Sequence, residues 1–233
     1  MRGIYSFQSA GGCSRRRFLG TVAISALGAM TTNVALTRPA WAQTTLTADA
    51  ALQALADGNR RYVDQHLQAF DEDLSVLRAH TEEEQEPFAT ILSCADSRVP
   101  VEVIFDQSIG HLFVARVAGN VASTEVIASL EYGVAILGTP LIMVLGHSHC
   151  GAVKAAIAGK EVPGQISALF APLRAAVDQA GPDLEATVKA NALVQAKLLG
   201  EASPVLAERV KAGKLKIVAA YYDLASGKVD LLG

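Results

Sequence analysis

Cysteine is scarce in this chain of 233 residues, which has only Cys13, Cys94 and Cys150. Cys13 lies in an N-terminal stretch that we expect to be removed, so two cysteines remain. Two cysteines allow either a single disulfide bond or a shared role as metal ligands. The residues that surround them bear on this choice.

Runs of basic residues are also missing from residues 43–233. This region has fifteen Lys and Arg against 23 Asp and Glu, which gives a net charge of −8. An acidic body without basic runs argues against nucleic-acid binding. No internal repeat or low-complexity tract stands out, and the length suits one domain with one sizeable core.

The first 42 residues contain no acidic residue, and positions 18–37 carry no charge at all. Arginines occupy positions 15–17, and Ala-Trp-Ala at 40–42 resembles a small-residue cleavage site. This pattern is typical of a twin-arginine export signal, cleaved after Ala42. A transmembrane anchor is the alternative, but Thr, Ser and Asn interrupt the apolar segment. We therefore expect the translocation machinery to export the protein, to the periplasm or otherwise out of the cytoplasm, with no stable membrane anchor.

Residues 43–233 alternate between apolar runs and amphipathic stretches. The apolar runs predict strands at 88–93, 111–117, 140–145, 214–222 and 229–232. The amphipathic stretches predict helices at 48–66, at 123–137, from Gly151 onward, and at 183–199 with Asp183 as N-cap. The sequence thus predicts an α/β fold: a mostly parallel central sheet flanked by helices, with residues 48–66 as an N-terminal helical arm.

Two short polar motifs follow predicted strands. Residues 94–98 read Cys-Ala-Asp-Ser-Arg, and residues 147–150 read His-Ser-His-Cys. In an open α/β sheet, ligand sites lie beyond the carboxyl ends of the strands, where the two cysteines and His147 would converge. Two thiolates and one imidazole suit a tetrahedral zinc ion with water as the fourth ligand. A disulfide bond would need neither the histidine nor the Asp96–Arg98 pair, so the metal site is favoured.

Taken together, these motifs resemble the signature of the β-class carbonic anhydrases, and the similarity runs from about residue 48 to the end of the chain. The resemblance implies one Zn²⁺ per chain, held by Cys94, His147 and Cys150. It also implies reversible hydration of carbon dioxide to bicarbonate and a proton, by a zinc-bound hydroxide that an Asp96–Arg98 dyad orients. A homodimer or higher homo-oligomer is implied as well. Further matching segments are 58–62, 116–120, 131–133 and 221–223.

The zinc site of this family has two states. In the open state water is the fourth ligand, whereas in the closed state Asp96 binds zinc and displaces the water. Gln85 lies nine residues before Cys94, where always-open members carry a glutamine that orients the substrate. We therefore favour the open state. The positions that match the family's apolar pocket for carbon dioxide are Phe113, Ala118 and Tyr132.

Two other functions would use the same residues. One is hydrolysis of a carbon dioxide analogue, carbonyl sulfide or carbon disulfide, for which the shape of the pocket would be decisive. The other is a non-catalytic zinc protein that senses bicarbonate; the Asp96–Arg98 dyad argues against it, because a structural site needs no orienting group. We interpret His149 as a structural neighbour rather than a ligand, and Gln107 as a packing or interface residue.

Overall fold

The computed structural model describes residues 44–69, 78 and 81–233. The predicted export signal at 1–42 lies outside the described residues, as does much of the acidic stretch before residue 81. Within the described part of the chain, no helix is both long and apolar enough to cross a membrane.

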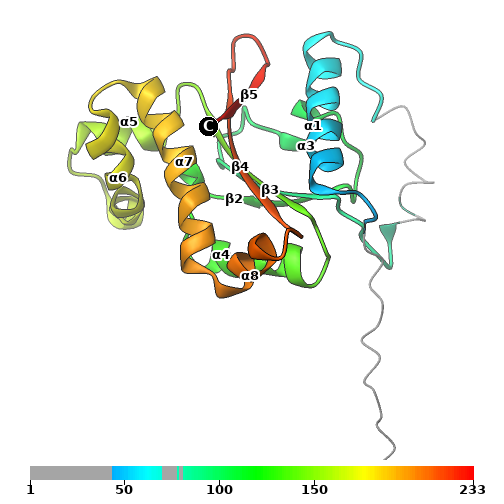
Figure 1. The fold of residues 1–233 in the computed structure, drawn as a ribbon. Helices are drawn as coiled ribbons and strands as arrows, with labels where there is room; N and C mark the ends of the chain where they lie inside the picture. The colour runs from blue at the N-terminus through cyan, green and yellow to red at the C-terminus, as the bar shows by residue number, and fades with distance from the viewer. Residues whose placement is uncertain (1–43, 70–77, 79–80) are drawn as a thin grey trace, which may run out of the picture. The chain divides into compact units, whose positions relative to one another are not determined.

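A five-stranded sheet lies at the centre of the fold, in the spatial order β2-β1-β3-β4-β5 (Figure 1). β1 to β4 run parallel, and β5 pairs antiparallel with β4. The prediction of a mostly parallel sheet is therefore confirmed. The strands are β1 (Ala89–Ser93), β2 (Leu112–Arg116), β3 (Leu141–His147), β4 (Lys216–Tyr222) and β5 (Val229–Leu232).

Helices connect the strands and cover the sheet. Thr47 caps α1 by accepting a hydrogen bond from the Ala50 amide. Asp183 caps α7 by accepting one from the Ala186 amide, which confirms the predicted N-cap. The longer helices are α1 (Ala48–Val63), α4 (Thr124–Ala135), α5 (Gly151–Ala158), α6 (Phe170–Ala180), α7 (Leu184–Ala202) and α8 (Pro204–Lys211). Shorter segments are α3 (Val101–Ile104), η1 (Ala118–Asn120) and η2 (Gly164–Leu169).

The core has two apolar layers because successive strand residues point to opposite faces of the sheet. Ile91 and Met143 pack on the side of α1 and α3. Leu92 and Val144 pack on the other side, against α4, α7 and α8. Figure 1 shows the sheet between α1 and α7, the arrangement expected for a parallel sheet that is buried on both faces.

One glycine lets a helix approach the end of β3. A Cβ atom on Gly146 would lie 2.9 Å from Cγ1 of Val188, which belongs to α7. Only a residue without a side chain fits there, so α7 packs tightly behind the next residue, His147. β3 extends two residues beyond the predicted apolar run, so that His147 is its last residue.

Candidate metal centre

Three buried side chains meet where β1 and β3 end. Cys94 directly follows β1, His147 ends β3, and Cys150 directly precedes α5. Their ligand atoms all lie within 4.8 Å of one another. None of the three residues is more than 3% exposed. The sheet thus brings together the three ligands that the sequence predicts.

The spacing of the two sulfur atoms distinguishes between a disulfide and a shared metal ion. Both cysteines are free, and Sγ of Cys94 lies 4.0 Å from Sγ of Cys150. A disulfide bond is about 2.05 Å long. Two thiolates on one tetrahedral zinc ion, each about 2.3 Å from it, lie about 3.8 Å apart. The observed spacing fits the metal site.

The His147 ring presents one unpaired nitrogen. Its Nδ1 atom lies 2.9 Å from the carbonyl oxygen of Ser148 and donates a hydrogen bond to it when protonated. The Nε2 atom is buried and finds no hydrogen-bond partner among the described residues. A buried polar atom without a partner points to an absent ligand. Metal-binding histidines commonly have one nitrogen fixed by a carbonyl and the other free for the ion.

The two sulfur atoms shift each other's pKa in opposite directions. The contact with Cys150 is the main cause that lowers the pKa of Cys94. The same contact, together with burial, raises the pKa of Cys150 far above its usual range. A cation that binds both sulfur atoms would displace the proton that remains between them.

Asp96 and Arg98 form a two-pronged ion pair beside this group. Arg98 donates from Nη2 to Oδ2 of Asp96 (2.7 Å) and from Nε to Oδ1 (2.9 Å), and its backbone amide donates to Oδ1 (2.9 Å). The guanidinium holds the pKa of the Asp96 carboxyl well below its usual range. Oδ2 of Asp96 lies 3.9 Å from Nε2 of His147, so an ionised carboxylate borders the ligand group.

Arg116 connects the end of β2 to the ligand loop, a role that the sequence motifs did not indicate. Its Nε atom donates to the carbonyl oxygen of Cys94 (2.9 Å), and its Nη2 atom donates to that of Asp96 (2.6 Å). One side chain thus fixes the backbone of both a ligand and the carboxylate. Because both acceptors are backbone atoms, only the register of β1 against β2 reveals this pairing.

The residues predicted to line the pocket lie in two different places. Ala118 is next to Gly119, whose backbone amide donates to Sγ of Cys94 over 3.3 Å. Phe113, the second residue of β2, packs instead on Tyr132 of α4, with the ring centroids 5.9 Å apart. Tyr132 is 43% exposed. The metal group is therefore adjacent to Ala118, and the aromatic pair lies on the outer strand and its helix.

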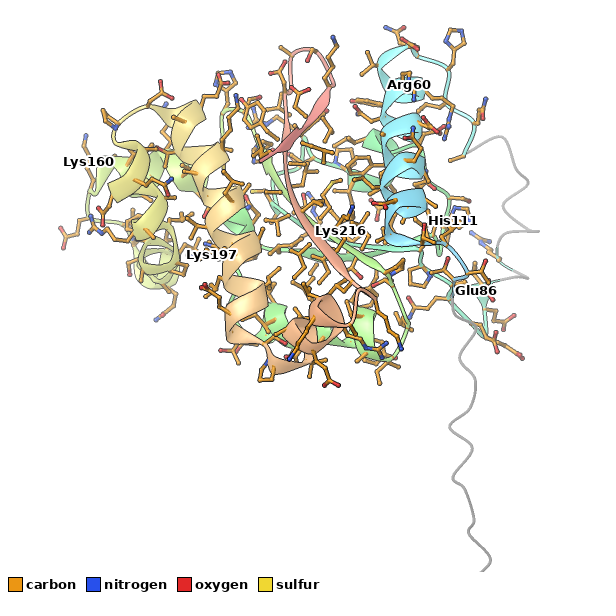
Figure 2. The ribbon with its side chains drawn as sticks, in the orientation of Figure 1. Arg60, Glu86, His111, Lys160, Lys197 and Lys216 are labelled. Atoms are coloured by element: carbon orange, nitrogen blue, oxygen red, sulfur yellow. The ribbon has the colours of Figure 1, made fainter. Side chains whose placement is uncertain are left out.

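Gln85 lies away from the metal group of its own chain. It is exposed and precedes the amino end of β1, whereas Cys94 follows the carboxyl end. A five-residue strand is about 16 Å long. Figure 2 shows the neighbouring Glu86 on the opposite side of the molecule from Lys160, which follows α5. One chain by itself does not bring this glutamine to Cys94.

The other two polar residues that we considered lie outside the ligand group. His149 has an exposed side chain, and its carbonyl oxygen accepts a hydrogen bond from Nη2 of Arg98 over 3.4 Å. Gln107 is 8% exposed and donates to the carbonyl oxygen of Phe105 over 2.8 Å. Their positions agree with a structural neighbour and a packing residue.

Comparison with known proteins identifies the family. The sequence model of the family described as carbonic anhydrase matches residues 89–229. The chain belongs to the carbonic anhydrase family. A carbonic anhydrase of Mycolicibacterium smegmatis is 37% identical over 197 residues, which cover 78% of this chain and 92% of the relative. Carbonic anhydrase 2 of Mycobacterium tuberculosis is 36% identical over 196 residues, with 78% and 91% covered.

This carbonic anhydrase has the fold of the β class. It resembles the β-carbonic anhydrase of Coccomyxa, solved in complex with acetazolamide, with a TM-score of 0.62 and 28% identity over 78% of this chain and 86% of that one. The β-carbonic anhydrase CafA of Aspergillus fumigatus gives a TM-score of 0.61 and 26% identity over 79% and 89%. The chain is thus an enzyme of this family.

Proposed function

We propose that this enzyme uses one Zn²⁺ per chain, held by Cys94, His147 and Cys150, to catalyse reversible hydration of carbon dioxide to bicarbonate and a proton. The observation that carries the proposal is the buried Nε2 atom of His147, which has no hydrogen-bond partner among the described residues and lies in a group with two cysteine sulfur atoms that form no disulfide. Thiolate and imidazole ligands in this number favour zinc. When bound, zinc supplies Lewis acidity that brings the pKa of water toward neutrality.

Asp96 would orient the attacking water. Its carboxylate stays ionised beside Arg98 and lies 3.9 Å from Nε2 of His147. An ionised carboxylate only accepts hydrogen bonds, so Asp96 would hold a proton of the water and turn an oxygen lone pair toward carbon dioxide. Arg98 is the positioning residue that holds Asp96 in this orientation.

The Asp96–Arg98 geometry supports the open state of the site. Both carboxylate oxygens accept hydrogen bonds from Arg98, over 2.9 and 2.7 Å. To become a metal ligand, the carboxylate would have to give up part of this charge-assisted pair. A water molecule is therefore the expected fourth ligand.

A second copy of the chain would complete the pocket. Gln85 precedes the amino end of β1, and Phe113 packs on Tyr132 over β2, so these residues are not gathered around Cys94. Gln85 and Tyr132 are both exposed, which leaves them free to contact another copy. A homodimer or higher homo-oligomer would bring them over the metal of the neighbour.

Export of the enzyme is a separate proposal, which rests on the sequence of residues 1–42. The signal would direct twin-arginine transport to the periplasm and be cleaved after Ala42. The protein recovered from a periplasmic fraction should begin at Gln43. Substitution of both Arg16 and Arg17 by lysine should keep it in the cytoplasm, and unchanged export of this variant would contradict the proposal.

Stopped-flow hydration of carbon dioxide, with zinc analysis on the same sample, tests the proposed reaction. We expect rapid turnover with about one zinc per chain. A zinc-replete protein without this activity would contradict the proposal. Hydrolysis of carbonyl sulfide or carbon disulfide, or binding of bicarbonate without turnover, would then be the alternatives to measure.

A further inference from the structure

Two side-chain amides are buried in α7, behind the metal centre. Asn191 and Gln195 are four residues apart, so they share one face of the helix, and neither is exposed to solvent. A buried amide destabilises a protein unless hydrogen bonds replace those it made with water. The hydrogen-bond partners of these two amides therefore show which parts of the fold the amides stabilise.

Both amides bond to the segment that follows β2. Asn191 Nδ2 donates to the carbonyl oxygen of Gly119, and Gln195 Oε1 accepts from the backbone amide of Ala122, each over 2.9 Å. Gln195 Nε2 donates to Oδ1 of Asn191 and to the carbonyl oxygen of Pro172, each over 3.1 Å. The amide pair thus ties α7 and α6 to the segment that contains η1.

This segment has a backbone conformation that needs support. Gly119 has a φ of +77°, and Asn120 has a φ of +45°. After glycine, asparagine is among the residues that adopt the left-handed region most readily, but the region still carries an energetic cost for it and persists where surrounding contacts hold it. A Cβ atom on Gly119 would lie 3.3 Å from Cβ of Ala152, so the segment is also tightly packed. Hydrogen bonds from α7 supply part of the support.

The supported segment contacts a metal ligand directly. The backbone amide of Gly119 donates to Sγ of Cys94 over 3.3 Å. An N–H group that points at a thiolate stabilises its charged form and fixes the direction of its remaining lone pairs. Gly119 therefore accepts a hydrogen bond from Asn191 at its carbonyl group and delivers one to Cys94 at its amide group.

We propose that Asn191 and Gln195 are positioning residues of the metal centre. Through Gly119 they hold an N–H group against the Cys94 sulfur, and they thereby increase the affinity of the site for zinc. The inference rests on the proposed zinc site. It also explains why two amides occupy a buried helix face whose other members include the apolar residues Val188 and Ala192.

Two variants of the full-length chain test this role. Asn191→Leu and Gln195→Met nearly preserve side-chain size but remove the amides. Zinc affinity is measured by competition with a chromophoric chelator, and the cobalt form is examined for its sulfur-to-metal charge-transfer band. Loss of an outer partner of a metal ligand costs about ten- to a hundredfold in affinity. Because Asn191 acts through Gly119, we expect a loss at the low end of this range, about tenfold, and a displaced band for Asn191→Leu, and a smaller loss for Gln195→Met.

Coupling between the two variants sharpens the test. Gln195 acts partly through Oδ1 of Asn191, so the double variant should lose less affinity than the product of the two single losses. Leu199→Ala is the matched control, because Leu199 is buried in the same helix but packs in the apolar cluster with α4 and α8. It should lower the melting temperature and leave zinc affinity and the cobalt band unchanged.

The outcomes separate this inference from the proposed reaction. If both amide variants keep the wild-type zinc affinity and cobalt band, the positioning role is wrong, whatever the hydration rate. If the wild-type protein binds zinc but does not hydrate carbon dioxide, the proposed reaction is wrong. In that case a tenfold loss of affinity in Asn191→Leu still supports the positioning role, and an unchanged affinity still overturns it.

Discussion

The candidate metal ligands and the residues predicted for the substrate pocket are arranged differently in one chain. One chain brings Cys94, His147 and Cys150 within 4.8 Å of one another at one edge of its sheet. In the same chain, Gln85 lies near the other end of β1, and Phe113 of β2 packs on Tyr132. The fold of one chain brings the three candidate ligands together, whereas the pocket that we propose would need a second copy. Under this proposal, the metal ligands need only the fold of one chain, and the substrate pocket needs contact between two chains.

Removal of a ligand should have the largest effect. His147→Ala deletes the imidazole of the ligand group, so zinc content should fall far below one per chain and kcat/KM should drop by more than about a hundredfold. Metal analysis and stopped-flow hydration on the same sample measure both. His66→Ala, at an exposed position just after α1, is the control and should change neither. A variant that keeps stoichiometric zinc would contradict the assignment of His147.

Loss of the orienting carboxylate should come next. Asp96→Asn keeps the side-chain shape but removes the charge, so zinc should remain bound while kcat falls by about a hundredfold, the scale expected when a reacting group loses its orientation. Steady-state kinetics with metal analysis provides the measurement. Equal losses of zinc and activity would instead mean that Asp96 acts on metal binding alone.

Arg98→Met tests the same pair through pH. Because Arg98 lowers the pKa of Asp96 in the folded state, the stability that the pair contributes is complete above about pH 3.9, the unfolded value. This stability is lost as pH falls through the lower, folded pKa. In Arg98→Met, the pKa of Asp96 in the folded state should return toward its ordinary value. The pair then contributes less to the stability of the folded protein, and acid unfolding begins at higher pH. Circular dichroism across acid pH measures it, and an unchanged midpoint would contradict the pairing.

Pocket variants should have a smaller effect that spares the metal. Gln85→Ala removes an amide that would orient the substrate, so kcat/KM should fall by about tenfold at full zinc occupancy. Gln68→Ala is a suitable control, because its side chain is also an exposed amide and only its backbone amide contacts Asp106. Unchanged kinetics in Gln85→Ala would remove Gln85 from the pocket.

The smallest effect is expected for the cap of the helix behind the metal centre. Asp183→Ala removes the side chain that accepts from the Ala186 amide. The loss should be about 1 kcal/mol, or roughly 2–4 °C in melting temperature for a domain of this size. Asp183→Asn should retain most of the stability. Zinc content and activity at 25 °C should stay unchanged. A loss of zinc would contradict this expectation and show that the amino end of α7 affects metal binding.

The sequence predicted the elements that have a strong pattern. Apolar runs marked β1 to β5, and Asp183 marked the start of α7. The helices α3, α6 and α8 were not predicted. α3 is a four-residue helix, too short to show periodicity. For α8 a usable signal was present, since Ser203 caps the helix and Pro204 occupies its first turn.

The sequence predicted the side chains that the fold brings together at the candidate metal centre, but not the side chains that support them. Cysteine, histidine and the carboxylate–arginine pair have a chemistry that their spacing reveals. Arg116 and Asn191 were missed because their acceptors are backbone carbonyl oxygens, of Cys94, Asp96 and Gly119. Every residue carries such an oxygen, so only the folded register identifies the partner.

The most direct test of the shared site is to combine two defective chains in one oligomer. Cys94→Ser and Gln85→Ala chains with different tags are produced together, and the mixed oligomers are purified. If the metal and the glutamine come from different copies, the Gln85→Ala chain supplies an intact metal group and the Cys94→Ser chain supplies the glutamine over it. We predict that the mixed oligomers exceed the mean activity of the two parents several-fold. Mixed oligomers no more active than that mean would contradict the account.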